Sequence, residues 1–263
     1  MPVGHLPGIG YCVRPGVETG GKIIMSQFRF PNESDEYRSR RNELLDQEIR
    51  LRDEIEKVAE QRRQLPPGGQ LKEAYGFERL GDGGKIESVS FDDLFGEHDS
   101  LIIYSMMFGP EWDAPCPSCT CIVDGLNVSG RAVQETSAIA VVAAASAEQL
   151  ADWAGRRGWT QINLVSGTKN SYLLDYAGFE TTDPGVVSVM NVFRKTQSGI
   201  FHFWASELLS RPMESGHPRH VDIVWPLWNL LDMTPQGRGD AIIPKQDYEH
   251  RYFSKNLLGE ATD

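Results

Sequence analysis

The stretch Gly109–Cys121 reads GPEWDAPCPSCTC and holds three of the four cysteines in this 263-residue chain. The apolar run Leu101–Phe108 directly precedes it and has the length of a buried strand. Pro117 follows Cys116 and suits the first position of a helix, where the N–H group that proline lacks has no partner. The sequence therefore predicts, in this order, a strand, a loop, a C-x-x-C motif and a helix.

Cys116 and Cys119 form the C-x-x-C motif at the start of the predicted helix. Residues three positions apart share a helix face, so these two thiols can form a disulfide. The helix dipole and the unpaired N–H groups of a helix N-terminus favour a thiolate, which makes Cys116 the expected nucleophile and Cys119 the resolving thiol. Cys121 lies about 200° around the helix from Cys119. It is expected to pack as a small apolar side chain or to serve as an auxiliary thiol or metal ligand.

Acidic residues flank the motif, and no Lys, Arg or His occurs between residues 108 and 127. Because Glu111 and Asp113 would raise the pKa of a nearby thiol, they oppose the helix dipole. We therefore expect Cys116 to be only modestly activated. Trp112 is expected either to shield the thiols and contact a substrate or simply to pack in the core.

The chain after the motif alternates strands and helices and closes with a β-hairpin. A near-continuous apolar run at residues 136–145 is typical of a strand in a parallel sheet that is covered on both faces. Two parallel β/α units followed by an antiparallel hairpin indicate an α/β, thioredoxin-like fold with a mixed central sheet and flanking helices. The expected elements are a helix at 147–157, a short strand at 161–165 and hairpin strands at 186–193 and 200–204.

A proline just before the hairpin is a second candidate for the site. Thioredoxin-like folds usually place a cis-proline opposite the redox cysteines, immediately before a strand. Pro184 precedes the strand predicted from Val186, so it is the candidate for that role and for substrate contact. Its neighbour Gly185 favours the alternative, in which Pro184 is an ordinary turn proline.

A long helix is expected before this domain, at residues 33–65. Apolar residues recur there every seven positions, although charged residues occupy part of the intervening seam. Such a helix either packs along its own domain or pairs with its copy in a homodimer through residues 33–65. The repeated positions are Leu44, Leu51, Val58 and Leu65.

Composition and local patterns divide the chain into four expected parts. Many Gly and Pro residues without a helical or strand period indicate a flexible leader. A Pro-Pro-Gly-Gly sequence ends the long helix. The parts are the leader at 1–32, the amphipathic helix at 33–69, the thioredoxin-like domain at 70–240 and a helical C-terminal tail at 241–263.

The chain has a net charge of −11, so it lacks the basic surface on which non-specific nucleic-acid binding relies. No apolar run approaches the roughly 20 residues that a membrane-spanning helix needs. We therefore expect neither a nucleic-acid nor a membrane partner. The few, clustered cysteines and the lack of a signal-peptide core predict a cytoplasmic protein. No cofactor is expected.

Two blocks of the sequence are the most specific: Phe108-Gly109-Pro110-x-Trp112 with Cys116-Pro117-Ser118-Cys119, and Leu231-Asp232-x-Thr234-Pro235-x-Gly237-Arg238. These blocks resemble the DUF899 family of thioredoxin-like proteins. The similarity covers roughly residues 33–240 and implies a thioredoxin-like fold without naming a substrate. The chain departs from the usual pattern at Cys121, where an aromatic residue is expected, and around Gly167–Tyr172.

Three hypotheses about function follow from these features. In the first, the protein is a thiol–disulfide oxidoreductase whose partners are a disulfide-containing or thiol substrate and an external dithiol reductant. Cys116 attacks the disulfide, Cys119 resolves the mixed disulfide, and the external dithiol regenerates the pair. In the second, Cys116, Cys119 and Cys121, with one histidine, hold a metal ion in a binding or sensing module. In the third, the protein is a non-catalytic interaction protein on a thioredoxin-like scaffold.

Overall fold

The computed structural model describes residues 29–81, 83–210, 225–237 and 245–246. The chain divides into two compact units, one ending at Gln64 and one beginning at Leu65, and each is described by itself. Most of the predicted leader at 1–32 and of the predicted tail at 241–263 lies outside the described residues, as does Cys12.

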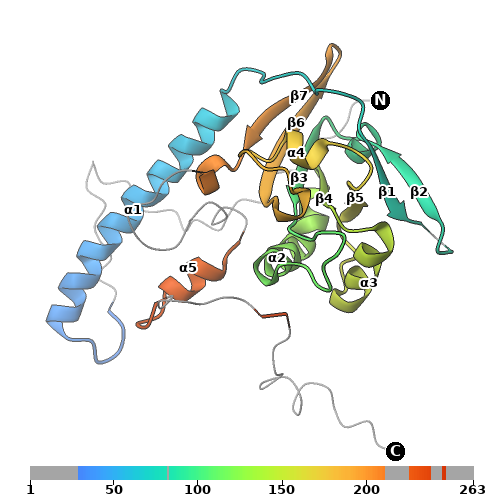
Figure 1. Ribbon diagram of the computed structural model, residues 1–263. Coiled ribbons are helices and arrows are strands. Elements are labelled where there is room, and N and C mark those ends of the chain that lie inside the picture. The colour runs from blue at the N-terminus through green and yellow to red at the C-terminus, as the bar shows by residue number, and fades with distance from the viewer. Residues whose placement is uncertain (1–28, 82, 211–224, 238–244, 247–263) are drawn as a thin grey trace, which may run out of the picture. The chain divides into compact units, whose positions relative to one another are not determined.

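The first unit contains helix α1 (Asp35–Arg63), which confirms the predicted long helix (Figure 1). Ser34 caps its N-terminus, because its side-chain oxygen accepts the backbone N–H of Tyr37 at 3.1 Å. Acidic residues occupy the first turn and basic residues the last, where each complements the helix dipole. Pairing of this helix with a second copy of the chain stays a prediction.

The second unit is built on one mixed sheet with the strand order β2-β1-β5-β4-β3-β6-β7 (Figure 1). Strands β3, β4 and β5 run parallel to one another. Strand β6 pairs antiparallel with β3, and β7 pairs antiparallel with β6. The strands are β1 (Gly76–Leu80), β2 (Ile86–Ser90), β3 (Ser100–Ser105), β4 (Ala138–Ala143), β5 (Asn163–Ser166), β6 (Val189–Thr196) and β7 (Gly199–Ala205).

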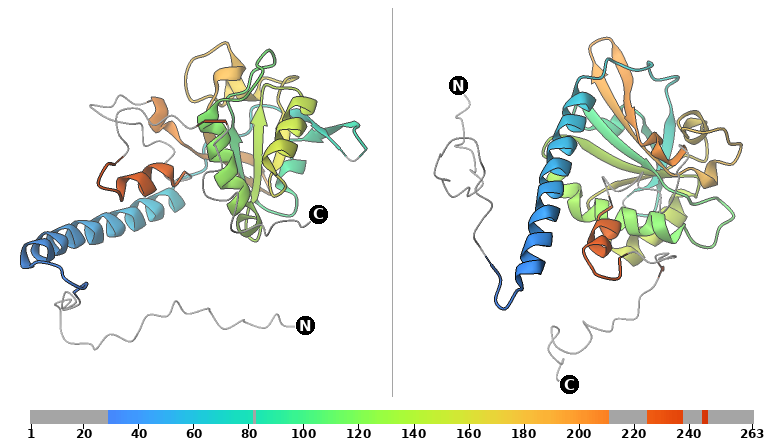
Figure 2. Two further views of the ribbon diagram at one scale, coloured as in Figure 1. Left: turned by 90° about the horizontal axis from the view of Figure 1, so that it is seen from below. Right: turned by 90° about the vertical axis from the view of Figure 1, so that its left-hand side faces the viewer.

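The run β4-β3-β6-β7 has the thioredoxin-like arrangement. The strand before the C-x-x-C motif pairs in parallel with the next strand along the chain and antiparallel with the first strand of the closing hairpin. The antiparallel β1–β2 hairpin extends the sheet at the edge beside β5, and it projects past the helices in Figure 2. The predicted fold class is therefore confirmed.

Helices α2 (Pro117–Val133) and α3 (Ala147–Arg157) lie together on one side of the sheet, as Figure 1 shows. This placement follows from two parallel crossovers in the same direction, from β3 to β4 and from β4 to β5. The short helix α4 (Tyr172–Asp175) and a 3₁₀ turn at Asp93–Phe95 cover the other side. A further helix, α5 (Leu227–Asp232), comes after the last strand in the sequence.

The ends of α3 show how local sequence sets an element. The side-chain oxygen of Ser146 accepts the backbone N–H of Gln149 at 3.2 Å, and the Gln149 side chain accepts the N–H of Ser146 at 2.9 Å. This capping box satisfies two N–H groups that the helix leaves unpaired. Gly158 ends the helix with φ of 70°, a left-handed conformation that glycine adopts without steric strain.

Side-chain alternation along β3 divides the core into two clusters. Leu101 and Ile103 face an aromatic cluster on one side of the sheet, whereas Tyr104 and Met106 face the side that carries α2 and α3. Cys119 belongs to this second cluster. The C-x-x-C motif therefore lies on the α2 side of the sheet, at the end of a central strand.

Among the residues that the structure describes, no helix combines the length and the apolar character that crossing a membrane requires.

Candidate active site

The C-x-x-C motif is held where the chain passes from β3 into α2. The N–H of Met106 donates to the carbonyl of Val142 at 2.8 Å, which continues the pairing of β3 with β4. The loop then folds back, and the N–H of Cys116 donates to the carbonyl of Met107 at 2.9 Å. Cys116 is the N-cap of α2 and Pro117 is its first residue, as predicted. The Cys116 thiol thus lies at a helix N-terminus.

Cys116 is the more exposed of the two thiols. It is partly exposed and free. Hydrogen bonding with the Cys119 thiol, together with interaction with the backbone N–H groups of Cys119 and Ser118, lowers the pKa of Cys116 to about 6, against the opposing effect of its partial burial. The sequence predicted only modest activation from the acidic flank. The pKa is lowered because the groups nearest the sulfur are donors of the helix N-terminus and the second thiol.

Cys119 has the opposite character. It is a free thiol with only 2% of its surface exposed. Donation of its hydrogen bond to Cys116 and its burial both raise the pKa of Cys119 well above the ordinary value for a thiol. A partly exposed thiol with a lowered pKa beside a buried thiol with a raised pKa is the arrangement expected for a nucleophile and a resolving thiol.

Two buried hydroxyl groups, from Ser188 and Tyr104, lie next to Cys119 in the core. The side-chain oxygen of Ser188 lies 3.6 Å from the Cys119 sulfur and 3.0 Å from the hydroxyl oxygen of Tyr104. Tyr104 is on β3, and Ser188 directly precedes β6, the antiparallel neighbour of β3. Sequence reasoning missed both residues, because a single polar group in an apolar strand is usually an ordinary core residue. The available signal for a role at the site was that each residue places a hydroxyl group within a strand predicted to be buried.

The family model for a bacterial protein of unknown function, DUF899, matches residues 27–254. The chain belongs to the DUF899 family. This confirms the resemblance found in the motif blocks. No curated protein matches the sequence.

Solved structures with related folds resemble this DUF899 protein only distantly. A peroxiredoxin-like protein from Aquifex aeolicus has 15% identity over 54% of this chain and 75% of its own, with a TM-score of 0.36. Enterococcus faecalis AhpC has 16% identity over 68% of this chain and 98% of its own, with a TM-score of 0.41. BsSco, a member of the Sco family of cytochrome c oxidase assembly proteins, has 13% identity over 53% and 85%, with a TM-score of 0.36. Such low values carry no argument about activity.

The peptide bond before Pro184 is not cis. Among the residues that the structure of the DUF899 protein describes, no peptide bond is cis, so the cis-proline hypothesis is wrong. Pro184 instead begins a 3₁₀ turn that ends at Val186, in which the Asp183 carboxylate accepts the N–H of Gly185 at 2.8 Å. The turn-proline alternative is therefore confirmed, and contact of Pro184 with a substrate stays a prediction.

This turn nevertheless lies against the loop that leads to the thiols. A Cβ atom at position 185 would lie 2.8 Å from the Cα of Gly109, closer than real Cβ contacts permit. We expect Gly185→Ala to lower the free energy of unfolding by about 1–3 kcal/mol, because one backbone segment must shift away from the other. Chemical denaturation measures this. The control is Gly155→Ala on α3, where an added Cβ meets nothing within 4 Å and should stabilise by about 0.5–1 kcal/mol. Equal stability of Gly185→Ala and wild type would contradict the close approach.

Trp112 packs beside the motif. Its side chain is partly buried against the second core cluster. A Cβ at position 109 would lie 2.7 Å from its indole nitrogen, so Gly109 leaves the space that the ring occupies. The Gln149 side chain donates to the carbonyl of Trp112 at 3.4 Å and joins this loop to α3. The packing role of Trp112 is thus present, whereas contact with a substrate stays a prediction.

Cys121 is turned to a different set of neighbours. The indole N–H of Trp225 donates to the Cys121 sulfur at 3.1 Å, and burial raises the pKa of Cys121. Both residues contribute to the second core cluster. In the part of the chain that the structure describes, no three His, Cys, Asp or Glu side chains converge in a way that would hold a metal ion. The packing role predicted for Cys121 therefore fits this DUF899 protein better than the role of metal ligand.

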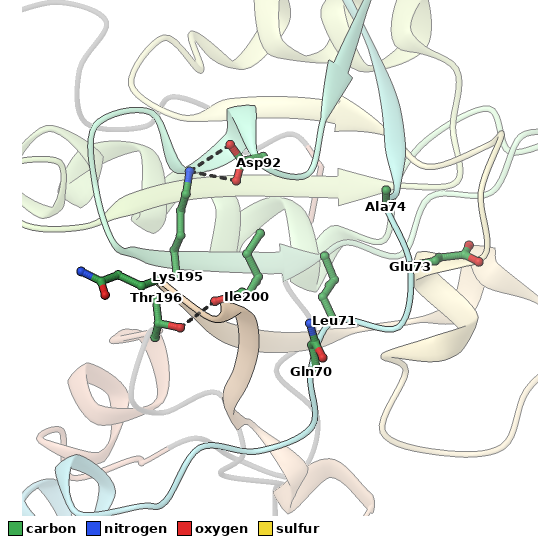
Figure 3. Close-up of a pocket in the computed structure, with 10 residues that line it drawn as sticks. Gln70, Leu71, Glu73, Ala74, Asp92, Lys195, Thr196 and Ile200 are labelled. Atoms are coloured by element: carbon green, nitrogen blue, oxygen red, sulfur yellow. Dashed lines mark hydrogen bonds and ion pairs between the residues drawn. The ribbon is translucent and has the colours of Figure 1, made fainter.

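A pocket of about 470 Å³ lies at the turn of the β6–β7 hairpin (Figure 3). Leu71 and Ile200 supply apolar walls, and the Lys195 side chain forms an ion pair with Asp92 at 2.8 Å. Strand β6 begins beside the thiol site and runs eight residues to Thr196. The pocket therefore lies roughly 25 Å along the strand from Ser188, too far to take part in thiol chemistry.

Proposed function

We propose that this DUF899 protein is a thiol–disulfide oxidoreductase in which Cys116 is the nucleophile and Cys119 is the resolving thiol. One observation carries the proposal. A partly exposed Cys116 at a helix N-terminus has a pKa of about 6 and is hydrogen-bonded to a buried Cys119 whose pKa is raised. This arrangement supplies a thiolate that can attack and a thiol held within the same site.

The reaction balances with a disulfide as oxidant. The Cys116 thiolate attacks one sulfur of the substrate R–S–S–R, forms a mixed disulfide, and releases R–S⁻. Cys119 then loses its proton and attacks the Cys116 sulfur. The second R–S⁻ leaves and takes up a proton, so the substrate gains two electrons and the cysteine pair becomes a disulfide. An external dithiol returns these electrons to the pair. We place this cycle in the cytoplasm, where dithiol reductants maintain thiols.

The pH dependence of Cys116 is the first consequence. With a pKa of about 6, Cys116 is largely thiolate at neutral pH, whereas an ordinary thiol with a pKa of about 8.5 is a few per cent ionised. The rate of Cys116 alkylation by iodoacetamide should rise with pH, with a midpoint near 6, and reach a plateau below the pH at which ordinary thiols ionise. Mass spectrometry of the Cys116 peptide measures that rate. A midpoint above pH 8 would contradict the activation.

Disulfide reduction tests the function itself. Supplied with dithiothreitol, the wild type should reduce a small peptide disulfide faster than dithiothreitol alone, and the Cys116→Ser variant should not. A wild type that adds nothing to the uncatalysed rate would overturn the proposal.

A further inference from the structure

Tyr104, Ser188 and Cys119 form a buried polar chain on the α2 side of the sheet. The exposed fractions of these residues are 1%, 8% and 2%, respectively. The Ser188 oxygen lies within hydrogen-bond reach of both neighbours, 3.0 Å from the Tyr104 oxygen and 3.6 Å from the Cys119 sulfur. Each hydroxyl can therefore donate in one direction, from Tyr104 to Ser188 and from Ser188 to the sulfur.

The resolving step requires a negative charge next to these buried hydroxyl groups. Cys119 must form a thiolate in a buried position, although burial disfavours the charged form. The titratable groups that act on Cys119 are Cys116, from the start of α2, and Tyr104, from β3. In the reduced protein, the hydrogen bond to Cys116 and burial raise the pKa of Cys119, whereas Tyr104 and the backbone N–H of Met107 lower it.

Formation of the mixed disulfide changes this balance. Once Cys116 is bonded to the substrate, it carries no negative charge, so its opposition to a Cys119 thiolate disappears. Burial remains unfavourable, and the nearby donors must then stabilise the charge. Tyr104 suits this purpose as a neutral donor, because burial raises the pKa of its own hydroxyl well above the ordinary value for tyrosine.

We propose that Ser188 is a catalytic residue of the resolving step, and that Tyr104 assists it in stabilising the Cys119 thiolate. This inference rests on the proposed oxidoreductase function. As Cys119 is deprotonated, the Ser188 hydroxyl donates to the sulfur and the Tyr104 hydroxyl donates to Ser188. Neither hydroxyl loses its proton. The Cys119 proton ends on the departing R–S⁻, while one S–S bond forms between Cys116 and Cys119 and the bond from Cys116 to the substrate breaks.

The experiment separates the two thiols by their reaction with dithiobis(nitrobenzoate). Cys12→Ser and Cys121→Ala are introduced first, so that only Cys116 and Cys119 react. Attack by Cys116 releases one coloured thionitrobenzoate and leaves the other attached. Attack by Cys119 then releases the second. Stopped-flow absorbance therefore records the nucleophilic step as a first phase and the resolving step as a second phase, at each pH.

In this background, Ser188→Ala should slow the second phase about tenfold or more and move its pH midpoint upward by about one unit, because a hydrogen bond to a charged sulfur is lost. Tyr104→Phe should act in the same direction, and Ser188→Thr should restore the rate. The first phase should change less than twofold. Matched controls are Ser105→Ala and Tyr172→Phe, which remove buried hydroxyls on the opposite side of the sheet and should leave both phases unchanged.

The possible outcomes separate this inference from the proposed function. Release of a single thionitrobenzoate by the Cys116/Cys119 background protein would overturn the redox pair, and this inference with it. Release of both, with a second phase unaffected by Ser188→Ala and Tyr104→Phe, would overturn the hydroxyl chain alone. So would equal slowing of both phases, which indicates a merely structural role. If Ser188→Ala does not fold, Tyr104→Phe decides, because it removes one oxygen atom and leaves the ring in place.

Discussion

Replacement of Cys116 by serine should reduce the catalysed rate of disulfide reduction at least about a thousandfold. The serine hydroxyl is not ionised at neutral pH, and the remaining thiol of the motif is a poor substitute. Cys119 is buried and its pKa is raised, so it presents little thiolate to a substrate. The measurement is turnover of a small peptide disulfide with dithiothreitol as reductant, after subtraction of the rate without protein.

The matched control for this substitution is Cys121→Ser. Cys121 lies in the same helix, but its sulfur accepts a hydrogen bond from Trp225. We expect its replacement to leave the rate of disulfide reduction within about twofold, since the thiol takes no part in the proposed cycle. Wild-type turnover in Cys116→Ser would refute the role of Cys116 as the nucleophile. A wild type without turnover above the uncatalysed rate would instead favour a non-catalytic interaction protein on a thioredoxin-like scaffold.

Replacement of Cys119 by serine should have a different effect, because it removes the second step and leaves the first. Cys116 should still attack the substrate, so the mixed disulfide accumulates to near one per chain. Turnover should fall at least about a hundredfold, since release then depends on the external dithiol alone. Intact-mass spectrometry measures the adduct, and peptide mapping should place it on Cys116. Dithiothreitol should remove it.

The double variant Cys116→Ser/Cys119→Ser is the control for the trapped adduct and should form none at the motif. An adduct located on Cys121 instead would show that a different thiol is the nucleophile. If Cys119→Ser keeps the wild-type rate of turnover and forms no adduct, the resolving thiol is not needed. Either result contradicts the roles assigned to the pair.

Most of the secondary structure around the thiols follows from short-range patterns. Proline after Cys116 and the apolar run before it predict the strand, the loop and the helix start correctly. The Ser146 cap and Gly158 set the bounds of α3 in the same way. These features depend on residues within a few positions of one another, and the alternation of strands and helices then indicates the fold class. Neither needs knowledge of which strand pairs with which.

The surroundings of the thiols depend on contacts between distant residues. Tyr104 and Ser188 are 84 positions apart, and Cys121 and Trp225 are 104 apart. A strand's own pattern does not specify which strand becomes its neighbour, because this results from packing of the whole sheet. For the same reason, local residues left the role of Pro184 open between a cis-proline and a turn proline. The C-x-x-C pair and the thioredoxin-like fold can therefore be predicted from local sequence. The hydroxyl groups of Tyr104 and Ser188 come together next to Cys119 only when β3 and β6 become neighbours in the sheet.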